Sequence, residues 1–211
     1  GGSLFDEDGK VAVNSPAAVE TVKRYQKLKE NGYIVMDTGR GEARQLFAQG
    51  KVAFYDDAVV AKGQAVSNGV APEEVVNVCS AMERPVLKSG DNPQSTMWGH
   101  MLVTFKNSKY KEEAAELAKT LVSDEVALDY FKNNGMPPIT KSAAQLDEVK
   151  NDAYLNGFLK STSTARLEET ARLTNANEIK TIVTEELQHA LLGDKTAEKA
   201  VADMAERLGA L

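Results

Sequence analysis

Two adjacent carboxylates, Asp56 and Asp57, directly follow the four-residue apolar run Val-Ala-Phe-Tyr at residues 52–55. A run of this kind is typical of a buried strand, and α/β folds place ligand-contacting groups at the carboxyl ends of their strands. Carboxylate oxygens at that position would accept hydrogen bonds from a polar ligand. Alternatively, one carboxylate caps a short helix predicted over residues 58–67, because Asp accepts hydrogen bonds from the free N–H groups of a first helical turn. An adjacent pair can fill both roles.

The only tryptophan, Trp98, is the second candidate for ligand contact. It follows residues 80–96, a polar stretch interrupted by Pro and Gly that we interpret as a connector between lobes. An indole exposed at a lobe boundary stacks on the apolar face of a sugar ring, while the sugar hydroxyls contact polar neighbours. The alternative is a core tryptophan, although a core residue seldom sits at the end of a loop.

The remaining motifs argue against catalysis and against a bound metal or cofactor. His100 and His189 lie far apart in the sequence, no Gly-x-Ser-x-Gly is present, and both phosphate-binding glycine motifs are missing. Residues 6–9, Asp-Glu-Asp-Gly, resemble a fragment of a calcium loop without its alternating ligand spacing. Cys79 is the only cysteine, so cysteine-based metal sites lack ligands. We expect no catalytic residue, no metal and no cofactor.

Composition restricts the partners of the chain. Its 211 residues carry 25 Lys and Arg against 31 Asp and Glu, a formal net charge of -6, and 42% of them are hydrophobic. A chain of this composition folds around an apolar core. Without a basic cluster it is not expected to bind nucleic acid, which requires cations to neutralise phosphates. No stretch of 18 apolar residues exists, so we expect no direct membrane insertion.

Local signals predict a helix-rich chain with a few short strands. An Asp-Gly turn at residues 8–9 predicts a β-hairpin between residues 4–5 and 11–13. Apolar spacing, caps and glycine stops predict helices from residue 16 to the stop at 31–32, over 42–49 and 58–67, from 110 to near 122, from 124 to 134, and over 143–160, 177–191 and 196–208. Apolar, β-prone runs predict strands at 52–55, 75–78 and 98–105.

Four segments, taken in order, resemble the extracellular solute-binding proteins of ABC importers, specifically the group that captures sugars. The first is the helix of residues 15–34, which a hairpin precedes. The second, ARQLFAQGKVAF at 43–54, is similar to the family segment F-x-x-G-K-x-A-[MF]. The third is Trp98-Gly99 followed by NSKYKEEAAELA at 107–118. The fourth runs from Ser-Asp-Glu at 123–125 to Gly-Met-Pro-Pro at 135–138, similar to the family's turn.

The resemblance implies an α/β, helix-rich, periplasmic-binding-protein-like fold with two lobes that trap the ligand between them. Family members are about twice as long, so we expect this chain to be the C-terminal half of a larger binding protein. It would contain mainly the second lobe, with one excursion into the first. Residues 1–92 would be a second-lobe segment, residues 93–144 the inter-lobe crossing and a first-lobe segment, and residues 145–211 the C-terminal helices of the second lobe.

The resemblance also nominates site residues and partners. The expected ligand-binding residues are Tyr55, Asp56, Asp57, Trp98, Gly99, His100, Asn177 and Glu178. Relatives often present an aromatic contact near Asn177, and here that aromatic is missing. With 13 aromatic residues in all, the chain favours a small or hydroxyl-rich mono- or oligosaccharide over a long stacking platform. The implied partner is an ABC permease, and the implied location is outside the cytoplasm, either periplasmic or lipid-anchored.

These features predict a non-enzymatic subunit that captures a carbohydrate by hinge closure and delivers it to a membrane permease. The alternative is a helical scaffold or adaptor without a small-molecule cleft, in which Trp98 is core and the acidic pair only caps a helix. A glycosidase ranks third, because it needs two carboxyl groups about 5 to 10 Å apart across the bond it cuts. Adjacent residues do not by themselves supply that pair.

Overall fold

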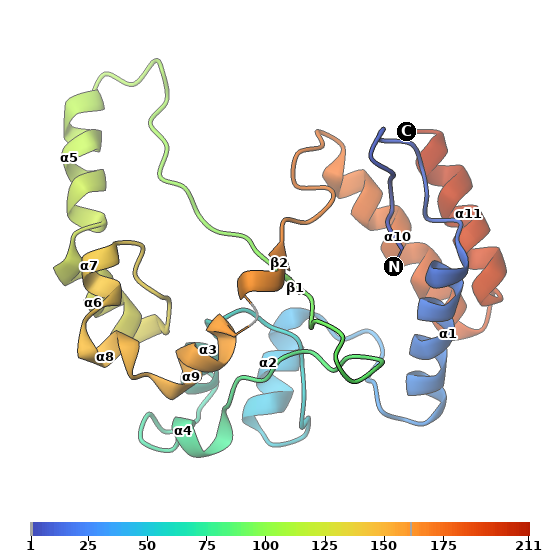
Figure 1. The fold of residues 1–211 in the computed structure, drawn as a ribbon, viewed down its shortest axis with the longest axis horizontal. Helices are drawn as coiled ribbons and strands as arrows, with labels where there is room; N and C mark the ends of the chain where they lie inside the picture. The colour runs from blue at the N-terminus through green and yellow to red at the C-terminus, as the bar shows by residue number, and fades with distance from the viewer. Residues whose placement is uncertain (1, 161) are drawn as a thin grey trace. The chain divides into compact units, whose positions relative to one another are not determined.

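A computed structural model of the chain describes residues 2–160 and 162–211. Two compact units contain them (Figure 1). Unit 1 combines Gly1–Asp37 with Leu167–Leu211, and unit 2 is the continuous segment Thr38–Arg166. The chain therefore enters unit 2 after Asp37 and leaves it after Arg166. Asp37 has a φ of 53°, a left-handed conformation that Asp tolerates better than most residues.

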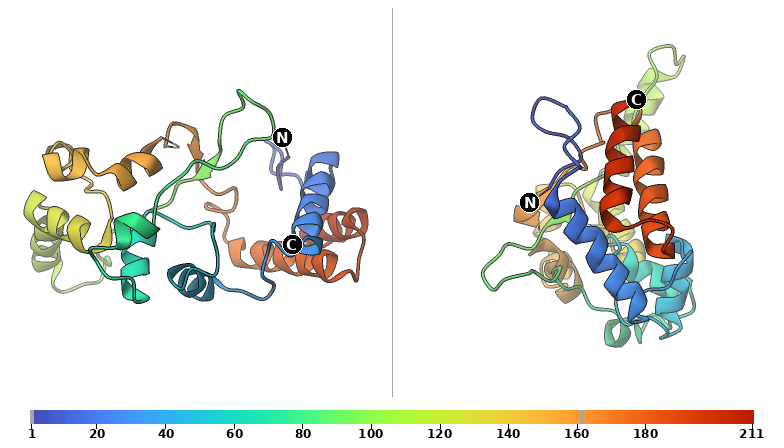
Figure 2. Two further views of the ribbon diagram at one scale, coloured as in Figure 1. Left: turned by 90° about the horizontal axis from the view of Figure 1, so that it is seen from below. Right: turned by 90° about the vertical axis from the view of Figure 1, so that its right-hand side faces the viewer.

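Unit 1 is built on three helices. They are α1 (Pro16–Glu30), α10 (Ala176–Leu192) and α11 (Ala197–Gly209), and each packs against the other two (Figure 2). Ser15 caps α1 by accepting a hydrogen bond from the N–H of Ala18, and Pro16 opens the helix, where its missing N–H costs nothing. Gly193 ends α10 in a left-handed conformation that favours glycine.

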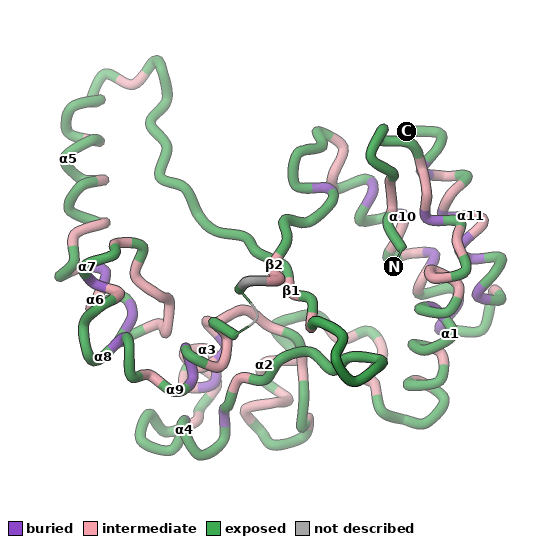
Figure 3. Tube along the Cα trace, in the orientation of Figure 1, coloured by how far each residue is buried: buried purple, intermediate pink, exposed green. Residues whose placement is uncertain are grey.

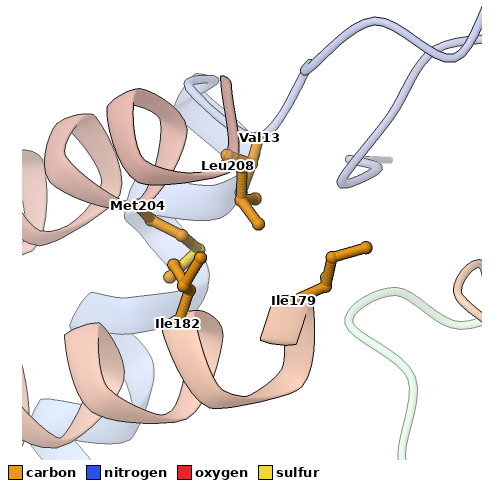
Figure 4. Packing of buried hydrophobic residues seen from close by; sticks show 5 residues of the cluster. All are labelled: Val13, Ile179, Ile182, Met204 and Leu208. Carbon is orange, nitrogen blue, oxygen red and sulfur yellow. The ribbon is translucent and has the colours of Figure 1, made fainter. Parts of the chain in front are cut away.

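The core of unit 1 lies where these helices meet. Ile179 and Ile182 on α10 pack with Met204 and Leu208 on α11, and Val13 joins them from the segment before α1 (Figure 4). A second cluster of small residues continues it: Val22, Ala190, Ala197, Ala200 and Val201. Small side chains allow the helix backbones to approach closely, so interdigitated packing rather than large residues fills this end of the unit.

An ion-pair network closes the α10–α11 turn. The buried carboxylate of Glu186 accepts hydrogen bonds from Lys195 at 2.5 Å and from Arg207 at 2.8 Å. Burial by itself would raise the pKa of Glu186, but these two cations outweigh burial and hold the pKa below its ordinary value. The network therefore ties the turn and the end of α11 to the middle of α10.

Unit 2 contains short helices joined by long irregular segments. Its helices are α2 (Arg40–Ala48), α3 (Ala61–Ser67), α4 (Val75–Val78), α5 (Lys111–Leu121), α6 (Asp124–Asn134), α7 (Lys141–Ala144), α8 (Asp147–Lys150), α9 (Ala153–Leu159) and the 3₁₀ turn η1 (Thr162–Thr164). Two two-residue strands, β1 (Ser95–Thr96) and β2 (Ala165–Arg166), pair in parallel with Ser95 opposite Ala165. This pairing connects the segment before Trp98 to the segment that leaves the unit.

Close backbone approaches shape the interior of unit 2. A Cβ on Gly63 in α3 would lie 3.1 Å from the carbonyl oxygen of Asn134, and one on Gly157 in α9 would lie 2.9 Å from the Cβ of Ala81. Glycine at these positions lets each helix rest directly on its neighbour. The core beside them contains Ala61, Ala65, Val75, Cys79 and Tyr154. A smaller cluster joins α6, α8 and α9 through Phe131, Val149 and Leu155.

Most of the expected helices are confirmed, as is the N-terminal hairpin. Phe5 and Val11 form an antiparallel bridge around the turn. The predicted stops at Gly32, Gly50 and Gly135 each fall at a glycine with positive φ. The helix predicted over 143–160 is instead divided into α7, α8 and α9. Asp152 explains the second division, because its side chain accepts the N–H of Leu155 and caps the start of α9, whereas α8 begins after Leu146 without a side-chain cap.

The three strand predictions are wrong. Residues 52–55 and 98–105, all of them described, form no strand, and residues 75–78 form the helix α4. Phe54 and the apolar side chains of residues 101–103 are exposed, as Figure 3 shows for the tube between β1 and α5. An apolar run becomes a strand only when a neighbouring strand satisfies its backbone N–H and C=O groups. Among the described residues, only β1 with β2 and the isolated bridge between Phe5 and Val11 form such a pairing.

Candidate functional site

Asp57 lies in a turn that α2 and α3 hold from both sides. Its carboxylate receives two hydrogen bonds from Arg44 of α2, from Nε at 2.7 Å and from Nη2 at 2.8 Å. The same carboxylate accepts the backbone N–H of Ala58 at 2.8 Å, and the Arg44 guanidinium also reaches Gln64 of α3 at 3.2 Å. Only 3% of the Asp57 side chain is exposed. Asp57 is thus a buried anchor for the turn.

The electrostatics of this turn follow from burial and pairing. Burial disfavours the charged form of Asp57, but the hydrogen bonds from Arg44 and Ala58 outweigh it and leave the pKa of Asp57 below its ordinary value. The carboxylate is therefore ionised at neutral pH and its charge is matched by Arg44.

Tyr55 packs against the same anchor. Its ring lies 4.8 Å from the ring of Phe47, centroid to centroid, and its hydroxyl interacts electrostatically with the Asp57 carboxylate. Burial, followed by the neighbouring negative charge of Asp57, raises the pKa of Tyr55 above its ordinary value. The Tyr55 hydroxyl consequently stays protonated at neutral pH.

Asp56, one residue away, has the opposite environment. Its side chain is 74% exposed and meets Arg84, which is 55% exposed, in a two-pronged ion pair. Arg84 Nε lies 3.0 Å from Oδ1 of Asp56, and Nη2 lies 2.5 Å from Oδ2. The expectation that one of the two acids caps the following helix is wrong, because α3 begins at Ala61 with Val60 before it and without a side-chain cap.

Trp98, Gly99 and His100 are all exposed, with Trp98 53% exposed. The Trp98 and His100 rings meet edge to face with centroids 5.3 Å apart. Two hydrogen bonds tether the segment just before them: Met97 donates its N–H to the carbonyl of Arg166 at 2.8 Å, and Thr164 Oγ1 donates to the carbonyl of Pro93 at 2.5 Å. Trp98 is therefore not a core residue, and the alternative that placed it in the core is wrong.

Asn177 and Glu178 belong to unit 1, in the first turn of α10, and both are exposed. The predicted site residues therefore form three groups: the turn at residues 55–57, the segment at 98–100, and the start of α10. A surface depression of about 790 Å³ in unit 1 has Asn175 and Ile179 among its lining residues. Neither Asn177 nor Glu178 lines it.

Two arginines complete the turn, and the sequence did not single them out. Arg44 lies in the segment at 43–54. The helical pattern of that segment does not predict that the Arg44 side chain contacts Asp57. Arg84 lies in the polar connector, where neither periodicity nor a motif marks it. Arg44 and Asp57 are 13 positions apart, with the end of a helix and an irregular segment between them, so no local periodicity relates the two residues.

The described residues contain neither a metal-type cluster nor a membrane-spanning helix. No three His, Cys, Asp or Glu side chains among them gather closely enough to hold a metal ion. No helix among them has the length and apolar character needed to cross a bilayer. Chemically, the groups described above offer hydrogen-bond donors, acceptors and one exposed indole.

Comparison with curated proteins gives relatives at low identity over the whole chain. A protein of Brucella abortus (strain 2308) is 25% identical over 214 residues, which cover 100% of this chain and 50% of the relative. The sn-glycerol-3-phosphate-binding periplasmic protein UgpB of Brucella melitensis is 24% identical over 218 residues, covering 98% of this chain and 48% of its own length. The chain thus spans about half the length of the curated relatives it matches.

Solved structures share the fold. One is an ABC transporter solute-binding protein from Thermotoga lettingae, bound with α-D-tagatose. The match covers 99% of this chain and 53% of that protein, with a TM-score of 0.84 and 22% identity. The match to the maltose-bound MalE3 of Thermotoga maritima covers 99% of this chain and 54% of MalE3, with a TM-score of 0.78 and 23% identity. The helix-rich α/β fold of the periplasmic-binding-protein type, expected from the sequence, is confirmed.

A family model supplies the remaining comparison. The model described as bacterial extracellular solute-binding protein matches residues 1–156, which include the hairpin, the turn at 55–57 and the segment at 98–100. The resemblance drawn from four sequence segments is therefore confirmed, and the chain belongs to the bacterial extracellular solute-binding protein family.

Proposed function

We propose that this chain is part of the substrate-binding component of an ABC sugar importer. The observation that carries the proposal is the family match over residues 1–156. The protein would capture a mono- or oligosaccharide between two lobes outside the cytoplasm and deliver it to a membrane permease. It would be either free in the periplasm or lipid-anchored. Relatives of this family are named as binding proteins of transport systems, which supports a role without catalysis.

The lobe assignment remains part of the proposal. Residues 1–92 and 145–211 would belong to the second lobe, and residues 93–144 would cross into the first. The exposed apolar side chains of residues 101–103 and Phe105 support such a crossing, because large apolar groups in a folded protein are usually covered by another surface. The proposed mechanism is hinge closure. A ligand that contacts both lobes only in the closed state binds that state more tightly, and it therefore shifts the population toward the closed state.

Within that site, each group would have a distinct task. Trp98 would stack on the apolar face of a sugar ring, with Gly99 and His100 beside it. Asp56 would accept hydrogen bonds from sugar hydroxyls, and Tyr55 with the buried Asp57 would fix the turn that presents it. Asn177 and Glu178 would add polar contacts from the start of α10. Burial of these hydrogen bonds on closure would strengthen them.

A thermal-shift screen of the full-length protein tests the function. The probes are D-tagatose, maltose, maltotetraose and sn-glycerol 3-phosphate, chosen because proteins of this fold or family are named for them or were solved with them. At 100 times the dissociation constant, a ligand stabilises by about 2.7 kcal/mol, a clear shift in Tm. We expect at least one sugar to stabilise the protein and to be recovered chemically unchanged. Hydrolysis of the sugar would indicate an enzyme, and no shift with any probe would favour a scaffold.

A further inference from the structure

The ion pair between Asp56 and Arg84 differs from a usual surface pair in how its partners are held. The two guanidinium contacts, 3.0 Å from Nε and 2.5 Å from Nη2, engage both carboxylate oxygens. The two residues lie 28 positions apart in irregular segments, one in the turn at 55–57 and the other in the connector at 80–96. Neither helix periodicity nor strand pairing brings them together. The pair adds a polar contact between two segments that Tyr55 and Ala81 already connect by packing in one apolar cluster.

The backbone beneath Asp56 is already fixed. Its neighbour Asp57 is held by two bonds from Arg44 and one from Ala58, and it is almost entirely buried. The packing of Tyr55 on Phe47 holds the other side. The Asp56 carboxylate therefore stands on backbone whose neighbours are held on both sides, which lowers the entropy cost of ordering that half of the pair when a ligand binds.

The chemistry of the pair suits a pair of hydroxyl groups. A carboxylate has about four acceptor positions, and the Arg84 contacts occupy two of them. The guanidinium is a planar group with five N–H donors. An ionised Asp and an Arg together have no net charge, so the pair offers donors and acceptors side by side without attracting a phosphate. A vicinal diol, which has two donors and two acceptors on neighbouring carbons, matches that arrangement.

We propose that Arg84 is a ligand-binding residue that acts together with Asp56 on a vicinal diol of a neutral sugar. This inference rests on the proposed function, in which Asp56 contacts the ligand. Because Arg84 covers both oxygens of Asp56, any hydroxyl that reaches this carboxylate also lies within reach of the guanidinium. Ligand specificity at this position therefore belongs to the pair and not to the acid alone.

Another exposed ion pair of unit 2 supplies a matched control. Lys132 of α6 and Glu148 of α8 lie 2.6 Å apart, with 51% and 58% of their side chains exposed. That pair joins two helices and does not adjoin the turn at 55–57. Its removal therefore measures what the loss of an exposed ion pair does to the fold without touching the proposed contact.

The test is isothermal titration calorimetry on the full-length protein, with whichever of D-tagatose, maltose and maltotetraose binds, and with the monodeoxy derivatives of that sugar. We expect Arg84→Met and Asp56→Asn each to weaken binding at least tenfold and the double variant to lose less than the product of the two effects, because both residues contact the same diol. Arg84→Lys should retain part of the affinity. Lys132→Met should bind as the wild type does, and none of the variants should shift Tm by more than a few degrees.

The deoxy sugars distinguish a direct contact from an effect on the fold. Removal of one hydroxyl of the contacted diol should weaken binding to the wild type and cause little further loss in Arg84→Met. Equal losses in both proteins would overturn the inference, as would unchanged affinity in Arg84→Met. If the wild type binds none of the three sugars, the result contradicts the proposed function itself, and the inference with it.

Discussion

Asp56 and Asp57 show how far two adjacent residues of the same type can differ in environment. Asp57 is buried against Arg44, whereas Asp56 is exposed and pairs with Arg84. The sequence places both acids directly after an apolar run and therefore identifies the turn, but not which acid is the anchor. That distinction depends on Arg44, 13 residues earlier, and local patterns do not encode such a contact. The exposure of Trp98, in contrast, agrees with its position after a polar connector.

Removal of each arginine separates the anchor from the exposed pair. Arg44→Met leaves Asp57 buried without its main partner and should lower the free energy of unfolding by about 3 kcal/mol. Arg84→Met breaks an exposed pair and should cost less than about 1 kcal/mol. Urea denaturation of both variants measures the difference. Equal losses would show that Asp57 is not the anchor that its burial implies.

Helices and strands differ in how well the sequence predicts them. The helices α1, α6, α10 and α11 are confirmed because their caps, glycine stops and apolar faces lie within the element itself. The strands predicted at 52–55, 75–78 and 98–105 are wrong because a strand requires a partner elsewhere in the chain. The run at 143–160 looked like one helix because its apolar spacing persists across Leu146 and Asp152, the two positions at which α8 and α9 begin anew.

Two helical glycines in unit 2 should respond to substitution in opposite directions. In Gly157→Ala, the new methyl group would lie 2.9 Å from the Cβ and 3.0 Å from the carbonyl oxygen of Ala81, so we expect a loss of about 1–3 kcal/mol. Gly41 in α2 has open space around it, so Gly41→Ala should gain about 0.5–1 kcal/mol from helix propensity. Thermal denaturation followed by circular dichroism compares them. A stabilised Gly157→Ala variant would mean that α9 does not rest on Ala81.

The α10–α11 network predicts a pH dependence. Because the folded-state pKa of Glu186 is below its ordinary value of 4.5, its ion pairs stabilise the folded chain above that pH, and the contribution is lost as the pH falls through the folded-state pKa. Glu186→Gln should be less stable than the wild type by about 2 kcal/mol at pH 7, and the difference should shrink toward pH 3. Glu185→Gln, at the exposed partner of Arg207, is the control and should change stability by less than about 1 kcal/mol. A difference that does not depend on pH would refute the ion-pair explanation.

At the scale of the whole molecule, the family was accessible from the sequence although several of its elements were not. The four segments that carry the resemblance extend from residue 15 to residue 138, and the family model matches residues 1–156. These segments are recognisable although the strand predictions are wrong, because caps, glycine stops and turn prolines are local features of the sequence. The sequence does not show how the candidate residues divide between the units, with residues 55–57 and 98–100 in unit 2 and residues 177–178 in unit 1.

The central claim is that a sugar binds against the exposed indole of Trp98, and calorimetric titration of Trp98→Ala in the full-length protein tests it most directly. Titrations with D-tagatose, maltose and maltotetraose should show that the wild type binds at least one of them with one site per chain. The variant should bind that sugar at least tenfold more weakly, a loss of at least about 1.4 kcal/mol, with its Tm in the absence of sugar nearly unchanged. Equal affinity in the wild type and in Trp98→Ala would contradict the account.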